Sequence, residues 1–201
     1  MPLPLLWLGA AALSAIAVNE LKQDRKTCQS LRGKQNRVLT LNDINSNEFP
    51  VMTYPSDVFT TEQCVQPQIG AIVCCGVAGI LDHTGIWIGD NTIAELDGNG
   101  LIKPISSQRF IKERSGKQIF IACDSLAQPL ASDFVSERAI KQLFSYQDYH
   151  VLYNNCHQFV WQCFPSQQNG EFQQNITTFR ELNYNIAHYF NRVIYWDALQ
   201  V

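Results

Sequence analysis

The sequence predicts an α+β fold with an antiparallel sheet, and three observations support this prediction. Short runs of β-forming residues, broken by Gly, Asn and Asp, follow one another from Ile69 to Cys123. Residues 132–144 have helical periodicity, and a second apolar helical segment begins near Cys156. The chain has 201 residues, of which 46% are apolar and 16% charged, so it can bury one substantial core.

Residues 1–20 form an apolar N-terminal segment. Leu3–Val18 carries no charge and is followed by Lys22, Arg25 and Lys26. This stretch is shorter than the roughly 20 residues of a straight membrane span, and it lacks the basic side chains that precede a secretory signal. We expect a membrane anchor or hairpin here; a signal peptide and a buried helix are the alternatives. Basic residues after an anchor predict that the chain following it is cytoplasmic, with export as the alternative.

The rest of the chain divides into three parts. Residues 21–66 are polar and weakly patterned, and we expect an N-terminal extension with short strands at 37–41 and 49–54. Residues 67–165 carry the strongest signals and form the predicted main domain. The aromatic-rich residues 166–201 are expected to end in a last helix, as a C-terminal helical extension.

The predicted domain begins with a β-rich run at 71–81, which precedes a hairpin at 83–96 around Gly89-Asp90-Asn91. A further strand is expected at 117–124, where β-forming residues lie between turn signals. The period then changes to that of a helix, for which Ser132 is a plausible N-cap. An extended piece leads from this helix to the one that begins near Cys156.

Charge and cysteine spacing remove several classes of function. The net charge of -3 gives no electrostatic reason to expect nucleic acid as a partner. None of the seven cysteines forms a C-x₂-C pair, so we expect no zinc, and no cofactor motif is present. Cys74 and Cys75 should point to opposite faces of a strand. We interpret most cysteines as reduced core residues; six paired thiols and one reactive thiol is the alternative.

The hairpin has ionisable residues at both ends, His83 and Glu95. A turn near Gly89 places these two positions opposite or nearly opposite each other on one sheet face. A carboxylate bonded to one ring nitrogen of a histidine fixes its tautomer and stabilises the imidazolium when the other nitrogen takes a proton. The spacing therefore predicts a base, His83, oriented by Glu95.

The candidate nucleophile is Cys156, at the predicted start of a helix after Asn154 and Asn155. The helix dipole and a partnered imidazolium would lower the pKa of a thiol there, and N–H groups of the helix start would stabilise an oxyanion. His157 competes as the base, but adjacent helical residues point about 100° apart, which disfavours this pairing. Cys163 would share the helix face of Cys156 but lies deeper in the apolar segment, so it is interpreted as a packing residue.

Two ordered motifs resemble those of the lecithin:retinol acyltransferase-like branch of the NlpC/P60 superfamily. The histidine-led strand of that family, H-x-G/A-I-Y/W-x-G-D, is similar to HTGIWIGD (His83–Asp90). Its nucleophile motif N-C-E-H-F-V is similar to NCHQFV (Asn155–Val160). The stretch Ile69–Cys163 carries the resemblance, which implies a permuted papain-like domain. Glu95 stands where animal members have a second histidine, and CHQ replaces CEH.

The resemblance implies thiol-dependent acyl hydrolysis or acyl transfer, with Cys156 as nucleophile, His83 as base and Glu95 as the orienting residue. The motifs favour a lipid or acyl ester near a membrane as the substrate, and the segment Leu3–Val18 agrees with a membrane association. A peptidoglycan or peptide amide hydrolase with the same three residues is the first alternative. A catalytically silent binding or scaffold module is the second.

Overall fold

The computed structural model describes residues 36–55, 64–77, 81–112, 114, 116–165 and 175–200, and single residues (23, 26–28, 30 and 32–34) before them. Arg37–Val201 form one compact unit and Met1–Asn36 another. The predicted membrane segment, residues 3–18, lies outside the described residues. Among the residues that are described, no helix combines the length and the apolar character needed to cross a bilayer.

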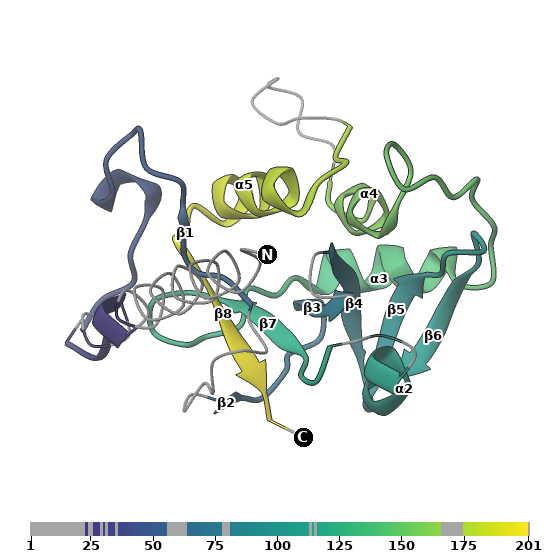
Figure 1. The fold of residues 1–201 in the computed structure, drawn as a ribbon, viewed down its shortest axis with the longest axis horizontal. Helices are drawn as coiled ribbons and strands as arrows, with labels where there is room; N and C mark the ends of the chain where they lie inside the picture. Colours follow the sequence, from purple (N-terminus) through teal and green to yellow (C-terminus); the bar gives the residue numbers. More distant parts are fainter. Residues whose placement is uncertain are drawn as a thin grey trace, which may run out of the picture. The chain divides into compact units, whose positions relative to one another are not determined.

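The Arg37–Val201 unit is built on an eight-stranded sheet with the order β1-β8-β7-β3-β4-β5-β6, and β2 also pairs with β8 (Figure 1). The strands from β8 to β6 pair antiparallel, as predicted, but β1 and β2 pair parallel with β8, so the sheet is mixed. Short apolar runs indicate strands but not the direction in which they pair. The strands are β1 (Val51–Thr53), β2 (Cys64–Val65), β3 (Ile72–Val77), β4 (Leu81–Gly89), β5 (Thr92–Leu96), β6 (Ile102–Ser106), β7 (Phe120–Cys123) and β8 (Ile194–Leu199).

Helices cover both faces of this α+β sheet. Buried residues of α3, α4 and α5 pack with Cys74 in one apolar cluster, whereas Phe110 of α2 packs with Cys75 in a second cluster. The two adjacent cysteines therefore face opposite sides of β3, as predicted. The helices are η1 (Leu41–Asp43, a 3-10 turn), α2 (Ser107–Lys112), α3 (Asp133–Gln142), α4 (Cys156–Gln162) and α5 (Phe179–Phe190).

One predicted helix is confirmed here and one predicted strand is corrected. Helix α3 follows Ser132 as its N-cap residue. Residues 37–41 do not form the expected strand, and the chain enters the 3-10 turn η1 there instead.

In the tail, the prediction of a helix to the end is wrong from Asn191 onward, where a φ of +51° ends α5. The β-branched and aromatic residues Val193–Trp196 then lead into β8, which pairs between other strands of the sheet and whose residues are all buried. The expected extensions 21–66 and 166–201 thus supply β1, β2 and β8 to the same sheet as the predicted domain 67–165.

Candidate active site

The hairpin of β4 and β5 turns at Asp90 and Asn91, which both have positive φ (+45° and +55°). This is the type I′ geometry that matches the twist of paired strands, and Asn and Asp tolerate it better than most residues. Ile86 pairs with Ala94, and that register, continued, sets Glu95 opposite Gly85 rather than opposite His83. His83 and Glu95 are therefore diagonal neighbours, a separation that two long side chains can bridge.

Their side chains meet: Nε2 of His83 lies 2.8 Å from Oε2 of Glu95. Glu95 is completely buried and His83 is 7% exposed. An ionised carboxylate accepts hydrogen bonds but cannot donate them, so Nε2 carries the proton in this contact and Nδ1 is the nitrogen left for another partner. The structure thus brings together two of the three predicted residues, at a distance that orients the imidazole.

Two cations surround the Glu95 carboxylate. Nη2 of Arg114 lies 2.8 Å from Oε2, and Nζ of Lys103 lies 3.6 Å from Oε1. Burial by itself raises the pKa of Glu95, but the hydrogen bond from His83 and the attraction of His83, Arg114 and Lys103 outweigh burial and lower it. Glu95 therefore remains a carboxylate in spite of its burial.

Cys156 is the first residue of α4, and Asn155 caps this helix. The side-chain oxygen of Asn155 accepts hydrogen bonds from the backbone N–H groups of His157 (3.0 Å) and Gln158 (3.2 Å). Its amide nitrogen donates to the carbonyls of Val151 and Thr177. These four bonds fix the start of the helix and confirm the predicted cap.

The cap also limits the expected role of the helix start in stabilising an oxyanion. Because the N–H groups of His157 and Gln158 are used by Asn155, they are not free to bind an oxyanion. Within the described residues the backbone N–H of Cys156 itself has no acceptor and remains available.

The Cys156 thiol has two histidine neighbours. Its Sγ lies 3.9 Å from Nδ1 of His157, so the two side chains are neighbours although the angle between adjacent helical residues disfavours this pairing. Burial raises the pKa of Cys156, but attraction to His83 and hydrogen bonds with His157 and His83 lower it well below its usual range. Conversely, burial lowers the pKa of His83, but the attraction and hydrogen bond of Cys156 and the hydrogen bond of Glu95 raise it. The two shifts together favour a thiolate–imidazolium pair.

Cys163, the C-cap of the same helix, shows what burial alone does. It is fully buried, and burial raises its pKa to about 12, against the weaker opposing effects of Arg138 and Gln142. Two buried thiols on one helix therefore have opposite pKa shifts, and the difference arises from the histidines beside Cys156. This agrees with the interpretation of Cys163 as a packing residue.

His157 is held from the sheet. Oγ1 of Thr84 lies 3.1 Å from Nδ1 of His157. Phe179 of α5 packs against the His157 ring, with 5.8 Å between the two ring centroids. Thr84 directly follows His83 on β4, so the two side chains point to opposite faces of the sheet. Thr84 contacts His157 on one face, and His83 lies on the other. His157, Lys103 and Arg114 are the site residues that the sequence reasoning did not assign.

Lys103 could have been predicted from the register of the next hairpin, because Lys103 of β6 pairs with Glu95 of β5. Arg114 follows the short helix α2 and carries no comparable signal.

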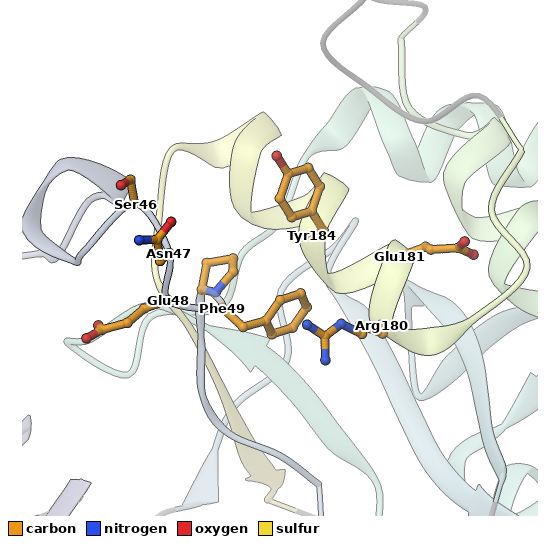
Figure 2. Close-up of a pocket in the computed structure, with 8 residues that line it drawn as sticks. Ser46, Asn47, Glu48, Phe49, Arg180, Glu181 and Tyr184 are labelled. Atoms are coloured by element: carbon orange, nitrogen blue, oxygen red, sulfur yellow. The ribbon is translucent and has the colours of Figure 1, made fainter.

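A separate pocket of about 290 Å³ lies between residues 46–50 and α5 (Figure 2). The guanidinium of Arg180 lies over the ring of Phe49 there, 4.4 Å from its centroid, and Tyr184 lines the same hollow. None of the lining residues belongs to the group around Cys156.

No group of His, Cys, Asp and Glu suited to hold a metal ion is found among the described residues. No protein-family model, no curated protein and no solved structure matches this chain.

Proposed function

We propose that the protein is a thiol-dependent acyl hydrolase or acyltransferase in which Cys156 is the nucleophile, His83 the base and Glu95 the residue that orients His83. The observation that carries this proposal is the buried 2.8 Å contact of His83 with Glu95 beside a thiol whose pKa is lowered by that same histidine. Perturbed, mutually coupled groups of this kind are typical of nucleophilic sites.

The chemistry follows from these groups. The Cys156 thiolate attacks the carbonyl carbon of an ester or amide, and the carbonyl oxygen becomes an oxyanion that the backbone N–H of Cys156 can bind. The tetrahedral intermediate collapses as the His83 imidazolium gives its proton to the leaving alcohol or amine, which leaves a thioester on the enzyme. His83 then takes a proton from water or an acceptor alcohol, whose oxygen attacks the thioester and releases the thiolate.

The coarse architecture is compatible with the permuted papain-like domain of the lecithin:retinol acyltransferase-like branch. The histidine lies on a strand, the carboxylate on the next strand, and the cysteine at the start of a later helix that packs on the sheet. This order, His83 to Glu95 to Cys156, is the one that the resemblance requires. We assign the chain to that branch as part of the proposal.

An apolar substrate is supported by the connection between α3 and α4, which we call the apolar connection (residues 143–155). Its side chains Phe144, Tyr146 and Leu152 are 72%, 72% and 71% exposed. Phe144 also has a φ of +67°, a conformation that costs a bulky residue free energy and that glycine would adopt without strain. Exposed apolar side chains that lead directly to Cys156 are suited to an acyl chain or a lipid surface.

We therefore propose a lipid or acyl ester as the substrate and a membrane-associated protein with its catalytic domain on the cytoplasmic side. The membrane association rests on the sequence of residues 3–18. A peptidoglycan or peptide amide would be attacked by the same thiolate, so substrate choice needs a direct comparison.

The test is covalent labelling of the full chain with iodoacetamide and with a lipid-like acyl probe, followed by peptide mapping. Wild type, Cys156→Ala and His83→Ala are compared, with Cys64→Ala as the matched control because Cys64 is an exposed cysteine. We expect the acyl probe to label Cys156 in wild type and in Cys64→Ala, and to label neither active-site variant.

Acyl labelling that persists unchanged in Cys156→Ala would refute the proposal, and absence of acyl labelling in folded wild type would support a silent binding module. A panel of phospholipids and peptidoglycan fragments then identifies the substrate class. Release of a fatty acid or transfer of an acyl chain supports the lipid assignment, and cleavage of the peptide alone contradicts it.

A further inference from the structure

We propose that Arg114 is a positioning residue of this site, which neutralises the buried Glu95 carboxylate and thereby tunes the base His83. This inference rests on the function proposed above for Cys156 and His83. It adds a residue to which neither the sequence motifs nor the resemblance assigns a role.

Arg114 is held in place by three contacts. Its Nη1 donates a hydrogen bond of 2.6 Å to the backbone carbonyl of Phe110, and its guanidinium lies over the Phe110 ring, 5.0 Å from the centroid. Its Nη2 donates to Oε2 of Glu95 at 2.8 Å. The side chain is 11% exposed, so solvent screens these contacts weakly. The same Nη2 lies 3.0 Å from Nε2 of His83.

The charges around the site form pairs. Nζ of Lys103 lies 2.6 Å from Oδ2 of Asp97 but 3.6 Å from Oε1 of Glu95. Asp97 therefore compensates most of the charge of Lys103. Arg114 is the cation in hydrogen-bond contact with Glu95. With Glu95 paired to Arg114, the imidazolium of His83 remains as the counter-charge of the Cys156 thiolate.

Without Arg114 the pairing changes. The buried Glu95 carboxylate would draw on the imidazolium for its compensation, and His83 would therefore bind its second proton, the one on Nδ1, more tightly. An imidazolium that binds its proton too tightly is a weaker acid toward a leaving group. Arg114 therefore acts through Glu95 and His83 and need not touch the substrate.

The groups that face this pair come from four segments: Cys156 and His157 from α4, Lys103 from β6, Asp97 from the β5–β6 turn, and Arg114 itself. Tyr149 is half-buried nearby, and burial and then the charge of Cys156 raise its pKa. A test of Arg114 must therefore keep these groups unchanged and must remove the thiolate from the titration.

The experiment is an NMR titration of the His83 ring in the full chain, in a Cys156→Ala background, where no thiolate holds the imidazole protonated. Arg114→Gln is compared with Arg114→Lys and with the matched control Arg109→Gln, which removes an exposed cation from α2. We expect Arg114→Gln to raise the pKa of His83 by about one unit or more, which means that His83 binds its proton about tenfold more tightly. The other two variants should leave this pKa nearly unchanged.

A His83 pKa in folded Arg114→Gln equal to that of the background would overturn the inference and leave Arg114 a structural role only. If Arg114→Gln does not fold, Arg114→Met, which keeps the length of the side chain, gives the same comparison with Glu95 in place. The Arg114→Met variant should then have the higher His83 pKa, and a value equal to that of the background would again overturn the inference. The titration needs no activity, so its outcome is independent of whether wild type proves to be an acyl enzyme.

Discussion

The replacement of His83 by glutamine tests the origin of the reactivity of Cys156. The attraction and hydrogen bond of His83 are among the interactions that lower the pKa of this buried thiol, and burial opposes them. Once His83 is removed, burial and the remaining hydrogen bond from His157 decide the ionisation of Cys156. We therefore expect the variant to form the thiolate only at much higher pH than wild type.

Cys163 provides the scale for this change, because burial raises its pKa to about 12 on the same helix. A thiol with such a pKa is ionised in roughly one molecule in 10⁵ at neutral pH, since each pKa unit changes the thiolate fraction about tenfold. His157 remains beside Cys156, and a more basic thiolate is intrinsically more nucleophilic, so both reduce the loss. We expect alkylation of Cys156 near neutral pH to slow by about 10²- to 10³-fold.

The assay is the rate of carbamidomethylation of the Cys156 peptide by iodoacetamide between about pH 5 and 10. The Cys64 peptide of the same sample is the internal reference, because Cys64 is exposed and has no part in the site. Equal midpoints for Cys156 in wild type and His83→Gln would refute the reasoning, since the histidine would then have no influence on the thiol. A slower reaction of both peptides would indicate a general change in the sample.

Two further predictions concern stability. A Cβ on Gly85 would lie 2.6 Å from Cγ2 of Ile93 and 2.9 Å from the carbonyl oxygen of Ala94, so Gly85→Ala should destabilise the protein by about 1–3 kcal/mol in urea unfolding; an unchanged midpoint would contradict the close packing. Because the folded-state pKa of Glu95 is lowered, its charge contributes stability above the unfolded value of about 4.3, and this contribution is lost as the pH falls through the folded pKa. Glu95→Gln should be less stable near neutral pH, by about 3 kcal/mol, and should lose less on acidification; parallel stability curves for the two proteins would contradict this.

The sequence predicted those parts of the site that depend on local geometry. Asp90 and Asn91 suit a type I′ turn, and the turn brings the ends of the hairpin together. Asn155 before an apolar helical run is a recognisable cap, and it placed Cys156 at the helix start. In each case the interaction spans few residues, so its pattern is contained in one short stretch of sequence.

The parts that it did not predict depend on contacts between distant segments. Arg114 reaches Glu95 across 19 residues, from a position after a short helix where neither periodicity nor a motif marks it. The parallel pairing of β1 and β2 with β8 joins segments that are separated by most of the unit. The angle between adjacent helical residues disfavours a pairing of His157 with Cys156, but this angle takes no account of the contact between Thr84 on the sheet and the His157 ring.

The position of the site in the sheet explains how one strand serves two layers. In the described strands β4 and β5, regular pairing ends at Ile86 and Ala94, so the strands are no longer joined where His83 and Glu95 lie. His83 pairs with Cys75 and Thr84 with Cys74 on the other side of β4, and these two cysteines belong to opposite apolar clusters.

His83 accordingly has its carboxylate partner on the α2 side of the sheet, while Thr84 contacts His157 of α4 on the other side. The Cys156 thiol at the start of α4 therefore has one histidine neighbour from the sheet, His83, and one from its own helix, His157, beside the point where regular pairing of β4 with β5 ends.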